Sequence, residues 1–194
     1  MEQGAPKPMN KNTSAQTSTQ TGAQTSTQTD AHTDAKPYTY RELTPSDNAA
    51  VAALIRTNLK EHKLDIPGTV YYDDGLDHLS DYYCDEDHKY YVLTDESGAV
   101  LGGVGFARFD PMPNTAELQK LYLDNSVKRK GLGYDLMTLV EDKMREAGFK
   151  TSYLETHDNL EAAIHLYEKC NYNEIPRPDF VKHSAMTRFF TKAL

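Results

Sequence analysis

A short basic segment, Lys128-Arg129-Lys130-Gly131-Leu132-Gly133, constrains the fold of this chain most strongly. Before it, residues 116–123 have the mixed polar and apolar pattern of a strand. After it, residues 132–147 are predicted to be helical, because apolar side chains recur at every fourth position. Gly148 is a typical helix stop, and residues 151–156 are again extended. The sequence therefore predicts a strand, a basic loop, a helix and a second strand in succession.

The basic loop has the composition of an anion-binding site. Gly131 and Gly133 tolerate a positive φ, which would let consecutive backbone N–H groups point into one concavity. The helix that follows would add the unpaired N–H groups of its first turn and its positive dipole end. Three cations precede the glycines, so we expect a ligand with several negative oxygens. An ordinary turn with a solvated basic face is the alternative.

Two other phosphate-binding motifs fit this loop poorly. A P-loop requires Gly-Lys-Ser/Thr after its glycines, and a dinucleotide fingerprint requires a third small residue where Leu136 stands. Both are therefore disfavoured.

The rest of the pattern predicts antiparallel strands that lead into the parallel unit around the loop. Strands are expected at 38–42, 89–95, 99–110, 172–175 and 184–192, and helices at about 47–60, 75–83 and 159–170. The predicted fold class is α+β, an α/β sandwich around one mixed sheet.

The first 37 residues differ from the rest in composition. They are dominated by Thr, Gln, Ser and Ala, and they repeat the heptapeptide Ala-Gln-Thr-Ser-Thr-Gln-Thr at Ala15 and Ala23. Such a segment buries too little apolar surface to offset the entropy of ordering it. We expect residues 1–37 to be a disordered tail and residues 38–194 to form a single domain.

Charge restricts the partners of this domain. The formal net charge is −8, and no Lys or Arg occurs between residues 65 and 87. The carboxylates of this stretch are Asp65, Asp73, Asp74, Asp77, Asp81, Asp85, Glu86 and Asp87. This charge disfavours nucleic acid as a partner, since its binding needs a basic face, whereas a cationic small molecule or peptide would be attracted. A solvated acidic loop without a steering role is the alternative.

Other composition features exclude further classes. No apolar run of 18 or more residues occurs, which argues against a membrane span. Cys84 and Cys170 are too few for a disulfide framework, so we expect a reducing cytoplasm and a packing role for Cys170. The histidines lack metal-ligand spacing, so no metal is predicted.

Three segments in order carry a family resemblance. They are Glu117-Leu118-Gln119-Lys120-Leu121-Tyr122-Leu123, then Lys128-x-x-Gly131-x-Gly133, then Asn159-x-x-x-Ala163-Ile164-x-Leu166-Tyr167-Glu168-Lys169. Together they resemble the GNAT superfamily of acetyl-CoA-dependent N-acetyltransferases. The resemblance covers about residues 89–175, with looser agreement across 38–194.

This resemblance implies a fold and a ligand. GNAT domains have a mixed, mostly antiparallel sheet in which two parallel strands splay apart, flanked by helices, and the thioester of acetyl-CoA enters that gap. The pyrophosphate would lie on the glycine loop, and the pantetheine arm would pair with the strand before it. The implied cofactor-binding residues are Leu121, Tyr122, Leu123, Lys128, Arg129, Lys130, Gly131, Leu132, Gly133, Tyr134 and Asn159.

The implied reaction is direct transfer of the acetyl group to a primary amine of a small molecule or peptide. Glu117 stands where many members carry the general base; the alternatives are a water chain, an exposed carboxylate or a structural ion pair. The N–H of Leu123 would stabilise the oxyanion. Tyr167 matches the family's general acid, with a half-buried helix aromatic as the alternative.

Two departures and several open choices remain. Lys128 stands where Gln or Arg is usual, and Asn171-Tyr172 replaces Gly-Phe; Asn tolerates the left-handed conformation of that turn. The donor could carry a longer acyl group, or the domain could be an acyl-CoA-binding sensor without turnover. The acceptor, expected to contact residues 62–83 and 176–183, is not identified, and a homodimer is left open.

Overall fold

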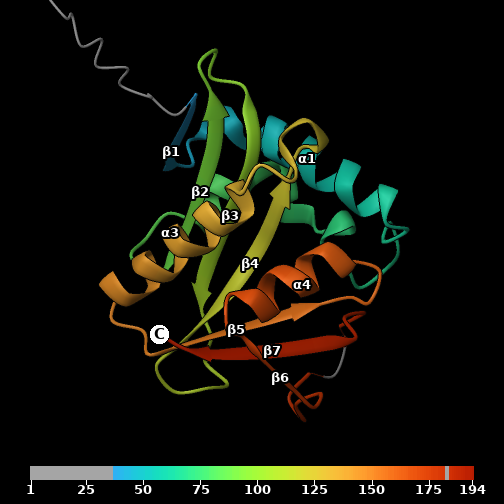
Figure 1. The fold of residues 1–194 in the computed structure, drawn as a ribbon, viewed down its shortest axis with the longest axis vertical. Coiled ribbons are helices and arrows are strands. Elements are labelled where there is room, and N and C mark those ends of the chain that lie inside the picture. The colour runs from blue at the N-terminus through green and yellow to red at the C-terminus, as the bar shows by residue number, and fades with distance from the viewer. Residues whose placement is uncertain (1–36, 182–183) are drawn as a thin grey trace, which may run out of the picture. The chain divides into compact units, whose positions relative to one another are not determined.

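The computed structural model describes residues 37–181 and 184–194, so the expected tail lies outside the described residues except for Pro37. Within them the chain forms one sheet of seven strands in the order β1-β2-β3-β4-β5-β7-β6 (Figure 1). The strands are β1 (Tyr38–Glu42), β2 (His88–Asp95), β3 (Val100–Arg108), β4 (Thr115–Leu123), β5 (Thr151–Thr156), β6 (Asn173–Ile175) and β7 (Arg188–Ala193). The helices are α1 (Asn48–Glu61), α2 (Leu79–Tyr82), α3 (Leu132–Glu146) and α4 (Glu161–Lys169).

One pair of neighbouring strands is parallel and the others are antiparallel. Strands β1 to β4 pair antiparallel in chain order, β4 pairs parallel with β5, and β7 pairs antiparallel with both β5 and β6. The predicted fold class, a mixed and mostly antiparallel sheet with flanking helices, is confirmed. The parallel pair flanks α3 and the basic loop, as the sequence pattern indicates.

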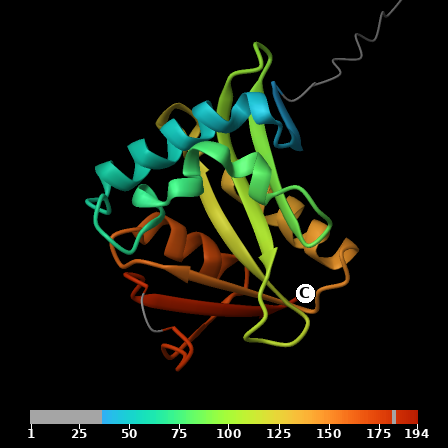
Figure 2. The same cartoon turned by 180° about the vertical axis from the view of Figure 1, so that it is seen from behind.

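Helices cover both faces of the sheet (Figures 1 and 2). Helix α3 packs its apolar stripe, Leu132, Leu136, Val140 and Met144, on one face together with α4. Helix α1 covers the other face through Val51, Ile55 and Leu59, joined by the short segment that contains α2.

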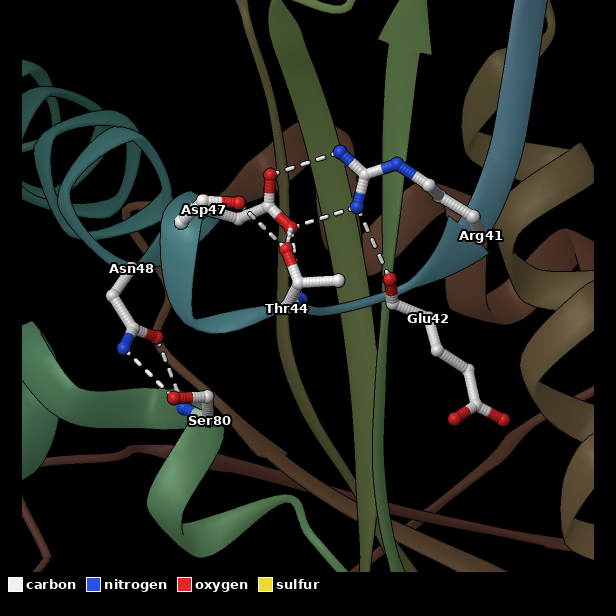
Figure 3. A network of polar contacts seen from close by, with 7 residues as sticks. Arg41, Glu42, Thr44, Asp47, Asn48 and Ser80 are labelled. Atoms are coloured by element: carbon white, nitrogen blue, oxygen red, sulfur yellow. Dashed lines mark hydrogen bonds and ion pairs between the residues drawn. The ribbon is translucent and has the colours of Figure 1, made fainter.

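A polar network fixes the start of α1 (Figure 3). Both carboxylate oxygens of Asp47 accept hydrogen bonds from the Arg41 guanidinium, at 2.7 and 2.9 Å. The same carboxylate accepts from the Thr44 backbone N–H at 2.8 Å. The hydrogen bonds from Arg41 lower the pKa of Asp47 to about 2. Asn48 continues the network, since its amide donates to the Ser80 hydroxyl at 2.8 Å and so holds α2 against α1.

Two turns adopt the conformation that the sequence predicts, whereas several element boundaries differ from the expected ones. Gly148 and Asn171 both adopt positive φ, 91° and 62°, as the sequence predicts. The helix expected at 75–83 is a 3-10 turn, Asp74–His78, followed by the short α2. Helix α4 begins at Glu161 instead of residue 159, and β7 begins at Arg188 instead of residue 184.

A side chain explains the late start of β7. The Arg177 guanidinium donates to the carbonyl oxygens of Val181, Ser184 and Met186, at 3.2, 3.2 and 3.1 Å. These carbonyls are therefore occupied by a side chain instead of a neighbouring strand.

None of the helices in the described ranges has the length and apolar character that crossing a membrane requires.

Candidate active site

Strands β4 and β5 separate partway along their length. Their paired residues are Thr115 with Thr151, Ala116 with Ser152 and Glu117 with Tyr153, whereas β4 itself continues to Leu123. A cavity of about 690 Å³ occupies the gap, and every residue from Glu117 to Leu123 lines it. The second half of β4 therefore presents an edge without a strand partner on the cavity side, which is where an extended ligand can pair with the main chain.

A β-bulge sits at the point of separation. Gly105 pairs with Gln119 and Gly103 with Tyr122, so two steps along β3 correspond to three along β4. Lys120 lies in this bulge, and its φ is 51°. The Tyr90 hydroxyl donates to the Lys120 carbonyl oxygen at 2.9 Å and holds the bulge in place.

Two glycines on β3 make room for Tyr90. A Cβ on Gly103 or Gly105 would lie 2.5 or 2.6 Å from the Tyr90 ring, which is closer than van der Waals contact allows. Small residues at these positions therefore let a fully buried tyrosine reach across the sheet to the bulge.

The basic loop adopts a left-handed conformation at Arg129 and Gly131, with φ of 63° and 82°. Of the two glycines only Gly131 uses a positive φ, because Gly133 lies in the first turn of α3 with a helical backbone. Its small size still matters, since a Cβ there would lie 3.1 Å from Cδ2 of Leu166 on α4. Among the described residues, the N–H groups of Leu132 and Gly133 have no hydrogen-bond acceptor, as is usual at a helix start.

Most of the predicted ligand-binding residues lie together around the cavity. The lining includes Leu121, Tyr122, Leu123, Lys128, Arg129, Gly131, Gly133 and Tyr134. Lys128 extends toward α1, where its ammonium donates to the Asn58 side-chain oxygen at 3.1 Å. This contact holds the Lys128 ammonium against α1.

Three predicted residues have side chains that do not line the cavity. The Lys130 ammonium donates to the Tyr38 hydroxyl at 3.3 Å. Leu132, the first residue of α3, is buried in the core between this helix and the sheet. The Asn159 amide donates to the His62 carbonyl oxygen at 2.9 Å and so ties the loop before α4 to the end of α1. Their roles in binding stay predictions.

The predicted general base lies where β4 and β5 part. Glu117 Oε2 accepts a hydrogen bond from the Gln119 amide at 2.6 Å, which fixes the carboxylate over the cavity. Burial raises the pKa of Glu117, and the nearby Glu155 adds to the rise, while the Gln119 hydrogen bond and Lys120 oppose it. A carboxyl with a raised pKa is a better proton acceptor than an ordinary one.

Four further residues surround Glu117 and were missed at the sequence level: Tyr83, Gln119, Lys120 and Glu155. The Tyr83 hydroxyl donates to Gln119 Oε1 at 2.7 Å, and the Lys120 ammonium lies 3.4 Å from the same hydroxyl. Glu155 on β5 also lines the cavity and accepts from the Tyr153 hydroxyl at 3.0 Å. Alternation along β5 was the available signal for Glu155, whereas nothing in the sequence of β4 announces the bulge.

The predicted general acid lines the opposite side of the cavity. Tyr167 on α4 is buried and packs against Tyr172 and Phe190, with ring centroids 6.0 and 6.1 Å away. Within the described residues its hydroxyl has no hydrogen-bond partner. Burial raises the pKa of Tyr167, so the phenol stays protonated at neutral pH and is able to donate.

The acidic stretch at 65–87 contributes little to the cavity. Of this stretch only Gly68, Thr69 and Val70 line it. Several of its carboxylates are engaged elsewhere: Asp77 binds Arg56, and Asp87 binds Arg108. The described part of the chain contains no cluster of three or more His, Cys, Asp and Glu side chains able to hold a metal ion.

Comparison with solved structures defines the class of fold. An acetyltransferase of the GNAT family from Staphylococcus aureus Mu50 superposes with a TM-score of 0.70 at 20% identity, covering 80% of this chain and 98% of that one. The PaiA N-acetyltransferase of Thermoplasma acidophilum, solved in complex with coenzyme A, gives a TM-score of 0.61 at 17% identity, covering 81% and 99%. The fold is that of acetyltransferases.

Sequence comparison identifies the family. The model of the acetyltransferase (GNAT) family matches residues 56–172. An uncharacterized N-acetyltransferase, YjgM of Escherichia coli K12, is 38% identical over 137 residues, which is 70% of this chain and 81% of that protein. The chain belongs to the GNAT acetyltransferase family and is an acyltransferase. The resemblance inferred from its motifs is confirmed.

Proposed function

We propose that this protein transfers the acetyl group of acetyl-CoA to a primary amine by direct attack. The observation that carries the proposal is the parting of β4 and β5 at Glu117, beside a cavity that runs from Glu117 to the glycine loop. The amine nitrogen forms the new bond to the acetyl carbon, the bond to sulfur breaks, and the amine proton leaves. The related chain from Salmonella typhimurium, yncA, was solved with its cofactor acetyl-CoA and has a TM-score of 0.64 at 22% identity.

The residues present fit coenzyme A. Its pyrophosphate would lie on Gly131 and the unpaired N–H groups of Leu132 and Gly133, with Lys128 and Arg129 supplying charge. The unpaired edge from Leu121 to Leu123 would hold the pantetheine arm. Binding energy at these remote groups would place the thioester beside Glu117.

Two side chains would move protons. An alkylammonium has a pKa near 10.4, so only a small fraction is free amine at neutral pH and a base must accept its proton. Glu117 would accept it, directly or through water. Tyr167, protonated and without a partner, would donate to the departing thiolate, while the N–H of Leu123 would stabilise negative charge on the acetyl oxygen.

The acceptor is an amine. The carboxylates of 65–87 do not line the cavity, although Asp73 acts on Lys120 there, so the preference for a cationic acceptor stays a prediction. The other elements of the proposal are a single domain from residue 38 onward and a location in a reducing compartment. Cys84 and Cys170, both free thiols, are consistent with that location.

Calorimetry and an acetylation assay test the proposal together. The folded protein should bind acetyl-CoA, and thiol release should depend on an added amine, with the acetylated product identified by mass. Absence of acetyl-CoA binding would refute it. Binding without turnover on any amine would favour the sensor alternative, and faster turnover with a longer acyl-CoA would favour the longer-acyl alternative.

A further inference from the structure

Lys120 is an unusual residue for its surroundings. It lines the cavity, and its ammonium contacts the Tyr83 hydroxyl at 3.4 Å and lies 5.7 Å from the Tyr83 ring centroid. No carboxylate of the described residues lies within 4.0 Å of this ammonium. A cation removed from water is costly unless a counter-charge compensates it, so the cavity has a cation that the protein itself does not pair.

The bulge turns the Lys120 side chain toward the cavity. In a regular strand, Gln119 and Lys120 would point to opposite faces of the sheet. Here both side chains reach the same Tyr83 hydroxyl, because the bulge rotates β4 between them. The backbone is held in a left-handed conformation that a lysine rarely adopts, and Tyr90 secures it. Such strain is commonly retained where it serves a site.

Position along β4 separates Lys120 from the cations expected to bind coenzyme A. Lys128 and Arg129 belong to the glycine loop beyond the end of the strand. Lys120 lies within the exposed edge of β4, three residues from Glu117. The end of the cavity that receives the amine thus has a carboxylate to accept its proton and a cation close by.

We propose that Lys120 binds the carboxylate of the acceptor, so that the acceptor is an amino acid, with its amine at Glu117 and its carboxylate at Lys120. The inference rests on the proposed function, because it assigns a substrate class to that same site. The ammonium would donate to a carboxylate oxygen in a charge-assisted hydrogen bond. A carboxylate and an ammonium that line the same cavity suit an α-amino acid better than a diamine, whose second ammonium Lys120 would repel.

Two opposing effects act on the pKa of Lys120. Burial lowers this pKa, whereas Asp73 and Glu117 favour the charged form of the lysine. A bound carboxylate would add to the latter effect and stabilise the ammonium.

The experiment compares amino acids with the same molecules lacking the carboxylate. The common L-amino acids are assayed with saturating acetyl-CoA, and each one acetylated is then compared with its decarboxylated amine, for example L-phenylalanine with 2-phenylethylamine. We expect kcat/KM to be roughly 10- to 100-fold higher for the amino acid, the range for a hydrogen bond between charged groups. In Lys120→Met this advantage should vanish, chiefly through KM, because kcat/KM for the amino acid should fall much further than kcat/KM for its decarboxylated amine.

Two controls separate recognition from structure. Lys120→Arg retains the cation and should keep a clear preference for the amino acid. Lys60→Met removes a lysine exposed on α1 and outside the cavity, and should leave the preference unchanged. Thermal unfolding of Lys120→Met verifies that the variant folds.

The outcomes distinguish this inference from the proposed function. Equal rates on amino acids and plain amines, or equal slowing of both in Lys120→Met, would overturn the role of Lys120 while leaving an acetyltransferase. Acetylation of plain amines alone would do the same. If acetyl-CoA does not bind, the proposed function fails and the inference fails with it.

Discussion

Two polar groups of this protein, the buried Asp47 at the start of α1 and the half-buried Lys120 at the β4 bulge, differ in their internal partners. Asp47 accepts hydrogen bonds from Arg41 and from the Thr44 N–H (Figure 3). Lys120 has one long contact, to the Tyr83 hydroxyl, and no carboxylate partner among the described residues. The first charge is paired within the fold and stabilises it, whereas the second is left for a ligand.

The two side chains differ more in their internal partners than in their burial. Asp47 is buried and Lys120 is half-buried, so burial alone does not show which of the two charges serves the fold. The number of internal partners does, because a fully paired charge has no capacity left for a substrate. Substitutions near Asp47 should therefore change stability, and substitutions near the bulge should change activity.

The largest effect is expected from Glu117→Gln. Loss of a general base lowers kcat/KM by about 10²- to 10⁴-fold. The Gln119 hydrogen bond can persist, since the new amide keeps an oxygen at that place.

The same substitution should also change stability. The raised pKa of Glu117 means that the folded protein binds the proton of this carboxyl more tightly than the unfolded chain does. That carboxyl therefore reduces stability as pH rises above the unfolded value, and we expect Glu117→Gln to have a higher Tm at pH 7.

The wild-type rate supplies the matching pH test. Activity should rise with pH through a pKa above the ordinary value of a glutamic acid, and this limb should be missing in Glu117→Gln. A profile that is identical in the two proteins would place the base elsewhere.

Tyr167→Phe should lower kcat by about 10²-fold if the phenol protonates the leaving thiolate. The ring packing against Tyr172 and Phe190 is retained, and the removed hydroxyl has no protein partner in the described residues. Tm and the calorimetric affinity for coenzyme A should therefore change little. A large drop in Tm with normal turnover would show that Tyr167 serves packing alone.

Asp47→Ala should do the reverse and leave kcat/KM unchanged. Loss of the Arg41 and Thr44 hydrogen bonds should cost about 2 kcal/mol, which lowers Tm by about 4–8 °C in a domain of this size. The folded pKa of Asp47, about 2, is below the unfolded value. Its contribution is therefore complete above the unfolded pKa and is lost as pH falls toward about 2.

Urea unfolding of both proteins across acidic pH measures this difference. Asp77→Ala is a suitable control, since the Asp77–Arg56 pair is exposed and should matter much less. A pH-independent difference for Asp47→Ala would assign its effect to packing.

Tyr83→Phe should have the smallest effect and lies between the two groups. It removes the hydroxyl that donates to Gln119 and contacts Lys120, at a stability cost of about 1 kcal/mol. Because Lys120 then loses its only hydrogen-bond partner in the described residues, preference for amino acids over plain amines should weaken without vanishing. Unchanged preference would mean that Tyr83 does not position the lysine.

The sequence by itself determined the fold class, the family and the positions of the main site segments. Local chemistry indicates the elements, since Gly148 is a typical helix stop and the apolar stripe of α3 repeats with the helical period. The glycine loop, Glu117 and Tyr167 could be placed because each occurs at a fixed interval in the chain. Whether Glu117 and Tyr167 act as base and acid stays a prediction.

Only the tertiary structure decided which side chains face the ligand around that framework. The bulge arises from contacts between β2, β3 and β4, where Tyr90 passes over Gly103 and Gly105 to reach the Lys120 carbonyl. Those residues are distant in sequence, and a one-residue change of register moves a side chain to the other face of a sheet. No local sequence signal therefore predicts that Lys120 lines the cavity. The sequence of the acidic stretch likewise does not predict that its carboxylates lie outside the cavity.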